Sequence, residues 1–121
     1  MKTLLVTFLL SVAASAVADT TLTGKWQVHT RISDRETDWS CAFTQSGSDL
    51  SGTCSADAGS GNVTGKIDGR KVTWTHKFNS SANGPITLNF RGALNSATDI
   101  TGSVNVEEYG VDGEFTATPS H

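Results

Sequence analysis

The sequence predicts an all-β fold, an eight-stranded antiparallel up-and-down β-barrel. Three observations predict it. Short segments alternate apolar and polar residues, turn-forming residues bound each of them, and no segment of helical length shows a 3.6-residue period. Within five segments a glycine follows an apolar residue by two positions, as in Leu50/Gly52, Val63/Gly65, Phe90/Gly92, Ile100/Gly102 and Val111/Gly113. Glycine inside a strand is costly, so its recurrence indicates strands curved tightly around a small barrel. A two-sheet sandwich is the main alternative.

Residues 1–18 are predicted to be a signal peptide. Lys2 gives the positively charged start, Leu4 to Leu10 the apolar stretch, and Ala16-Val17-Ala18 the small-residue cleavage site before Asp19. The apolar stretch is too short to cross a bilayer as a helix. Residues 19–121 are then a single β-barrel domain, and the protein is expected to be secreted or periplasmic.

The expected strands cover residues 22–32, 38–45, 49–56, 61–68, 71–78, 85–94, 99–107 and 111–118. In each, one face is apolar and the other polar, as in antiparallel sheets with one wet face. The longest gaps, 33–37, 57–60 and 79–84, are rich in Asp, Ser, Asn and Gly and are expected to be surface loops. The other connections are short, and closing the sheet into a barrel removes its edge strands.

The second and third strands predict a disulfide bond. A hairpin turning through residues 46–49 places Gln45 opposite Leu50 and Phe43 opposite Gly52. The same register places Cys41 opposite Cys54, where facing residues come close enough to be bridged. An exported protein meets an oxidising environment, so these two cysteines are expected to form a structural crosslink.

Two later connections also specify a register. Gly69 and Arg70 fit a two-residue loop that aligns Ile67 with Val72. The turn over residues 95–99 places Leu94 opposite Ile100 and Gly92 opposite Gly102.

Several segments together resemble the avidins and lipocalins, small barrels of the calycin type. Gly24-Lys25-Trp26 is similar to the G-x-W that opens their first strand, and residues 47–53 are similar to the second hairpin of the avidins. Residues 68–74 resemble the avidin segment that ends on a pocket tryptophan, and residues 111–116 resemble the closing strand. Phe90 stands where avidins carry a tryptophan, and Glu114 where they carry an aspartate near biotin. The resemblance implies a barrel with a ligand at one end.

The aromatic residues on the inner face are the candidate ligand-binding residues. Period-two alternation places the three tryptophans there, and the whole candidate set is Trp26, Trp39, Trp74, His76, Phe90 and Tyr109. An eight-stranded barrel is either filled by its side chains or holds one small ligand. If the barrel holds a ligand, Trp39 and Trp74 are expected to stack on it near one mouth, and Trp26 is expected to close the bottom.

His76 is the candidate catalytic residue if the protein is an enzyme. It shares the apolar face with Trp74, and it is either a core histidine bonded to a backbone carbonyl or a proton-transfer group. Glu107, Glu114 and Tyr109 are the candidates for a second polar group. His29 is expected on the outer face, and no histidine spacing predicts a metal site.

Composition restricts the function. The formal net charge of −3 argues against nucleic acid or anionic membranes as partners, and no motif calls for a cofactor. The favoured function is binding of a small hydrophobic molecule. The alternatives are a cofactor-free lyase, isomerase or cyclase acting on an apolar substrate, or an exported inhibitor of a hydrolase or protease with a protein partner. Asn62 and Asn79 match the glycosylation pattern and would matter in a eukaryotic source.

Overall fold

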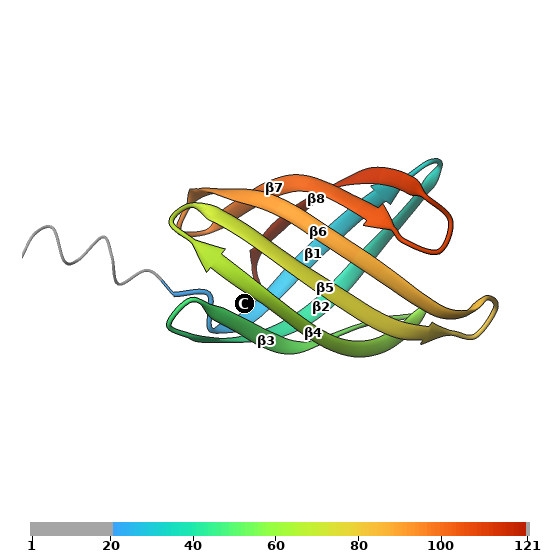
Figure 1. The fold of residues 1–121 in the computed structure, drawn as a ribbon, viewed down its shortest axis with the longest axis horizontal. Coiled ribbons are helices and arrows are strands. Elements are labelled where there is room, and N and C mark those ends of the chain that lie inside the picture. The colour runs from blue at the N-terminus through green and yellow to red at the C-terminus, as the bar shows by residue number, and fades with distance from the viewer. Residues whose placement is uncertain (1–20, 121) are drawn as a thin grey trace, which may run out of the picture.

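The computed structural model describes residues 21–120 and confirms the predicted fold. Eight antiparallel strands form a closed barrel in the order β1-β2-β3-β4-β5-β6-β7-β8 (Figure 1). The predicted signal peptide and its cleavage site lie outside the described residues. The strands are β1 (Gly24–Ile32), β2 (Arg35–Ser46), β3 (Asp49–Ala56), β4 (Gly59–Asp68), β5 (Lys71–Ser80), β6 (Gly84–Ser96), β7 (Asp99–Val106) and β8 (Val111–Pro119).

The barrel closes where β8 pairs with β1, from Trp26 opposite Pro119 to Ile32 opposite Gly113. Because consecutive strands run in opposite directions, the connections alternate between the two ends. The turns 33–34, 57–58, 81–83 and 107–110 share one end, which we call the mouth. The turns 47–48, 69–70 and 97–98 share the other end with the beginning of β1 and the end of β8 (Figure 1).

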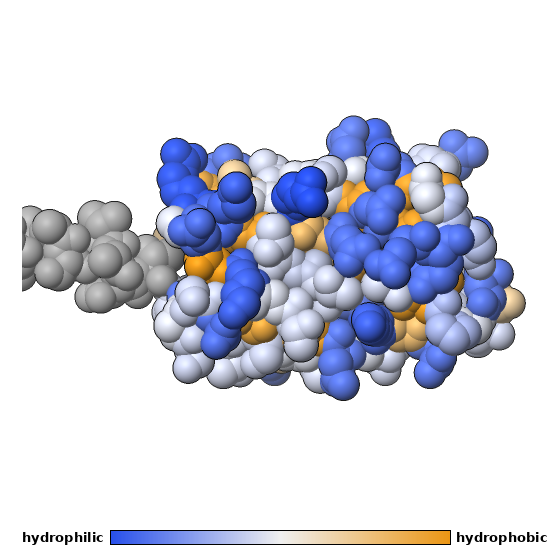
Figure 2. Space-filling model, viewed as in Figure 1, coloured by the Kyte–Doolittle hydropathy of each residue, from blue (hydrophilic) through white to orange (hydrophobic). Residues whose placement is uncertain are grey.

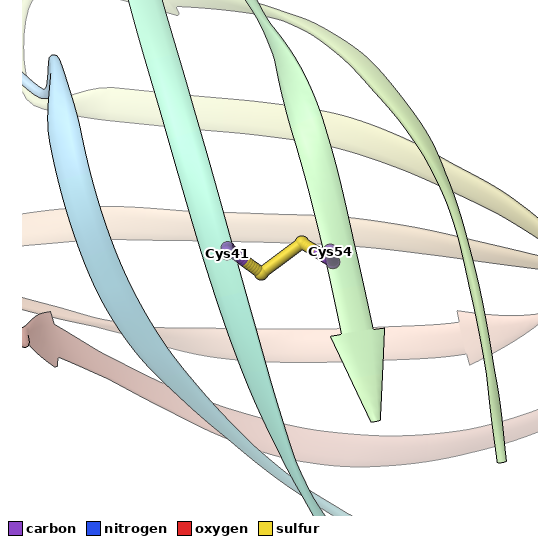
Figure 3. The surroundings of a disulfide bond; sticks show 2 residues. All are labelled: Cys41 and Cys54. Atoms are coloured by element: carbon purple, nitrogen blue, oxygen red, sulfur yellow. A yellow bond between two sulfur atoms is a disulfide. The ribbon is translucent and has the colours of Figure 1, made fainter. Parts of the chain in front are cut away.

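The predicted hairpin of β2 and β3 is confirmed. Cys41 lies opposite Cys54 with their Cα atoms 4.0 Å apart, and the two form a disulfide bond across the pair of strands (Figure 3). The registers expected for two other hairpins are confirmed as well, with Ile67 opposite Val72 and Leu94 opposite Ile100.

The three longest predicted loops are shorter than expected. The connection between β1 and β2 is only Ser33 and Asp34, and Ser33 makes this tight turn with a φ of 57°. β2 therefore begins at Arg35, because the β1/β2 pairing extends to Arg35 opposite Ile32. Similarly, the connections expected over 57–60 and 79–84 shrink to 57–58 and 81–83.

The strand glycines lie where a neighbouring backbone comes close. A Cβ atom at Gly102 would lie 2.5 Å from the Cα of Gly92 and would also collide with the carbonyl oxygen of Arg91. A Cβ at Gly92 would lie 2.7 Å from the Phe115 ring. The curvature inferred from sequence thus crowds these positions against adjacent backbone as well as against interior side chains.

The core is the interior of the barrel. Its buried apolar side chains form one cluster, which includes all three tryptophans and four phenylalanines. Hydrophilic and neutral residues cover most of the outer wall seen in Figure 2. Among the described residues, the exposed large hydrophobic side chain is Tyr109, at 58%.

Candidate functional site: an open cavity at the mouth

A cavity of about 770 Å³ opens at the mouth of the barrel. Residues of all four mouth turns or their flanking strands line it. Its buried lining residues are mainly apolar and comprise Thr30, Trp39, Phe78, Ile86, Leu88 and Val106. Polar residues such as Ser33, Asp34 and Asn83 lie on its rim. Its size falls within the usual range for small-molecule sites.

Three aromatic rings, Trp39, His76 and Phe78, form what we call the mouth cluster. The Trp39 and His76 ring centroids lie 4.8 Å apart at 89°, and Trp39 and Phe78 lie 5.1 Å apart at 62°. His76 stacks on Phe78 at 5.1 Å. Trp39 and Phe78 line the cavity directly, whereas His76 does not. The cavity therefore has an aromatic surface backed by a histidine.

His76 is a buried, neutral histidine. It is 1% exposed, and burial lowers its pKa to about 4, against a smaller opposing effect of a hydrogen bond with the Cys54 backbone. Its Nε2 has no hydrogen-bond partner within residues 21–120, and the same is true of the indole nitrogens of Trp39 and Trp74. No carboxylate in this part of the chain bonds to His76, so the geometry does not assemble an acid–base pair around it.

The interior beyond the mouth cluster is filled. Trp74 stacks on Phe90 with centroids 4.7 Å apart and an interplanar angle of 17°, and it meets Phe43 and Phe115 edge-on. Trp26 approaches Phe43 at 6.3 Å. These five rings, which we call the inner cluster, follow the barrel toward its other end and leave the ligand-sized space at the mouth.

Leu22 closes the end opposite the mouth. The residue is 1% exposed; its backbone N–H donates to Gln45 Oε1 at 2.8 Å, and its carbonyl accepts from the Trp26 indole at 2.9 Å. The backbone N–H of Gln45 in turn donates to Thr23 Oγ1 at 2.9 Å. These hydrogen bonds hold the chain just before β1 across this end of the barrel, which it closes. A second hollow of about 610 Å³ lies at this end, and Leu22, Ile67 and Leu94 are among the residues that line it.

The turn between β7 and β8 is held at the mouth by Glu108. Its carboxylate accepts the backbone N–H of Thr87 at 2.7 Å, and this bond lowers the pKa of Glu108. The backbone N–H of Glu107 donates to the Thr87 carbonyl at 3.0 Å. This double attachment to β6 sets Tyr109 beside the cavity, where it is part of the lining.

The predicted site residues thus divide into three groups. Trp39 and Tyr109 line the cavity, His76 lies behind it, and Trp26, Trp74 and Phe90 belong to the filled interior rather than to the cavity lining. Trp26 lies beside the closed end, where its indole N–H donates to the Leu22 carbonyl. Trp74 was expected near the mouth, but it stacks on Phe90 in the inner cluster and does not line the cavity.

Sequence reasoning missed much of the remaining lining. Arg35 and Thr37 were assigned to a loop, and Ile86, Leu88 and Val106 were not among the candidate ligand-binding residues. Alternation backwards from Trp39 would have placed Arg35 and Thr37 on the inner face.

His29 lies outside, on the barrel wall, as predicted. Its ring nitrogens contact Asp38 at 2.5 Å and Glu36 at 2.9 Å, and the first of these contacts contributes most to the raised pKa of His29. Across residues 21–120 no group of three or more His, Cys, Asp or Glu side chains is arranged to hold a metal ion. That part of the chain also contains no helix long and apolar enough to cross a membrane.

Fold and cavity together define a closed eight-stranded up-and-down barrel with one open end. Two solved structures share this fold with TM-scores of 0.64 and 15% sequence identity. One is a redesigned β-barrel, of which 92% is covered by 83% of this chain. The other is the redesigned β-barrel mFAP1 bound to DFHBI, of which 94% is covered by 82% of this chain. No family model and no curated protein matches the sequence.

Proposed function

We propose that this protein binds a small apolar molecule inside the mouth of the barrel. The observation that carries the proposal is the cavity itself, which is about 770 Å³ in volume and has buried apolar walls. Burying the apolar surface of a ligand against such walls supplies the main driving force for binding. Leu22 at the other end makes this a pocket with one opening rather than a channel.

Two further observations support the proposal. The barrel mFAP1, which has the same fold, was solved with DFHBI bound. The resemblance to avidins and lipocalins also favours ligand binding at one end of a barrel, and we propose a relationship to these families on that pattern. We also propose that the protein is secreted. The Cys41–Cys54 disulfide is compatible with the oxidising compartment that a secreted protein enters.

The neutral fluorophore N-phenyl-1-naphthylamine provides the test, because its emission rises in apolar surroundings. We expect saturable binding to the wild-type protein. Val106→Trp, which places a large ring among the cavity walls, should weaken binding at least about tenfold. Ser103→Trp is the matched control, since Ser103 lies exposed on the outer face of the same strand.

Both variants should first be shown by circular dichroism to retain the wild-type fold. Absence of saturable binding to the wild type would count against a ligand pocket. Equal affinity in the two folded variants would place the bound fluorophore somewhere other than this cavity.

A further inference from the structure

Arg35 is the one charged residue on the inward register of the described strands. The inward series of β2 contains Trp39, Cys41 and Phe43, all buried, and Arg35 lies on the same series four residues before Trp39. The other Lys, Arg, Asp and Glu side chains of these eight strands occupy the alternate, outward positions. Arg35 is therefore a cation on a face that otherwise carries no Lys, Arg, Asp or Glu side chain.

The position of Arg35 is at the opening of the cavity. It begins β2, lies opposite Ile32 of β1, and lines the cavity together with Thr37 and Trp39. Its side chain is exposed at this rim, which spares it the cost of burying a charge.

The side chain of Arg35 also makes no hydrogen bond or ion pair with any residue between 21 and 120. Arg31 provides a contrast at the same end of the barrel. It lies on the outward series of β1 and contacts Glu36 at 3.8 Å. The guanidinium of Arg35 is thus available to a molecule in the cavity, whereas that of Arg31 is directed to a carboxylate of the protein.

We propose that Arg35 binds the acid group of the ligand, and that the ligand is an apolar carboxylic acid in its ionised form. This inference rests on the proposed function. A guanidinium presents paired N–H donors that match the two oxygens of a carboxylate, and the charge strengthens both hydrogen bonds. The hydrocarbon part of such a molecule would lie against Trp39, Phe78 and Leu88, deeper in the cavity.

Two acidic residues flank Arg35 and oppose the binding of an anion. Glu36 is already engaged, by His29 at 2.9 Å and by Arg31, which offsets its charge. Asp34 remains as the competing carboxylate on the rim. Direct hydrogen bonds to Arg35 outweigh a repulsion acting through solvent, because water and salt screen exposed charges that are not in contact.

Three ligands with the same twelve-carbon chain test the proposal by isothermal titration calorimetry at pH 8, below their micelle concentrations. They are dodecanoate, dodecanol and dodecyltrimethylammonium, which carry a negative, a neutral and a positive head. The proteins are wild type, Arg35→Gln, Arg35→Lys and the matched control Arg31→Gln, which removes the same charge from the outer face.

We expect wild type to bind dodecanoate about tenfold more tightly than dodecanol. Arg35→Gln should abolish this preference by weakening the binding of dodecanoate, Arg35→Lys should restore part of it, and Arg31→Gln should leave it within about twofold. A preference for dodecanol or for the cation, or equal effects of the two glutamine variants, would overturn the proposal while leaving the ligand pocket intact. Failure of all three ligands to bind wild type would instead contradict the proposed function.

Discussion

His76 presents its ring to Trp39 at a right angle, with the two centroids 4.8 Å apart. The two side chains come from β5 and β2, which are not neighbours in the sheet, so they meet across the interior of the barrel. This contact is part of the burial of the imidazole, and that burial lowers the pKa of His76 to about 4. A charged imidazole would lose its hydration here without gaining a carboxylate partner.

His76 should therefore make the fold sensitive to acid. The unfolded chain binds a proton near pH 6.5 and the folded chain only near pH 4, so stability is complete above pH 6.5 and falls between these values. At pH 5 the loss due to this group should be about 2 kcal/mol. Urea denaturation of wild type and His76→Phe at pH 7 and pH 5 measures it, with a smaller loss in the variant. The same pH dependence in both proteins would contradict a buried neutral His76.

Trp74 should behave as a core residue. It is 2% exposed and packs on Phe43, Phe90 and Phe115, so Trp74→Ala should lower the free energy of unfolding by about 3–5 kcal/mol. Trp74→Phe keeps a ring in this position and should cost less. Denaturant unfolding followed by circular dichroism checks both changes. A loss below about 1 kcal/mol for the alanine variant would mean that the interior around Trp74 is not packed.

Gly102 should not tolerate even alanine. The added Cβ would collide with the backbone of β6 at Arg91 and Gly92, and backbone cannot rotate aside as a side chain can. We expect a loss of about 2–4 kcal/mol in unfolding free energy, measured by chemical denaturation. Gly47→Asn is the control, because this turn position has open space and a φ of 61° that asparagine adopts readily. Equal tolerance at both sites would refute the close approach of β6 and β7.

Removing the disulfide should destabilise the protein without changing its fold. Cys41 and Cys54 are separated by 13 positions, and closing a loop of this length is worth about 3 kcal/mol through the unfolded chain. The double variant Cys41→Ala, Cys54→Ala should show this loss in denaturant, and wild type should show a similar one in a reducing agent. If a reducing agent leaves the stability of the wild-type protein unchanged, the disulfide bond is contradicted.

His29 should titrate above its ordinary pKa of 6.5, in the opposite direction to His76. Its contact with Asp38 is the largest cause, so Asp38→Asn should bring the pKa down toward 6.5. The stabilisation that His29 contributes is present below pH 6.5 and disappears as pH rises through the raised value. Proton NMR of the imidazole resonances measures both values, and an unchanged His29 pKa in the variant would contradict the contact.

Much of the barrel could be predicted because its information is local. Alternation decided which face of each strand is buried, and the short turns fixed the registers of Cys41 with Cys54 and of Ile67 with Val72. The position of a residue along the barrel axis was harder. The position along the axis depends on how far each strand is shifted relative to its neighbours, summed around the barrel. The sequence of one strand does not specify that sum. For this reason Trp74 was assigned to the correct face but to the wrong depth.

Arg35 shows a second limit of the sequence. A stretch that reads Ser-Asp-Arg-Glu-Thr has the composition of a loop, and composition outweighed the alternation that continues from Trp39. The pairing of Arg35 with Ile32 is what makes this stretch part of β2. Pairing with a neighbouring strand extends a strand beyond the residues whose own preferences favour it.

The eight-strand count has a practical consequence for handling the molecule. The backbone N–H of Ser120 donates to the carbonyl of Lys25, so the chain leaves the barrel next to where it enters, at the end that Leu22 closes. A tag, a fluorophore or a solid support attached through the carboxyl terminus would hold the protein by its base. The cavity would then face the solution, which makes the barrel suited to immobilised ligand capture.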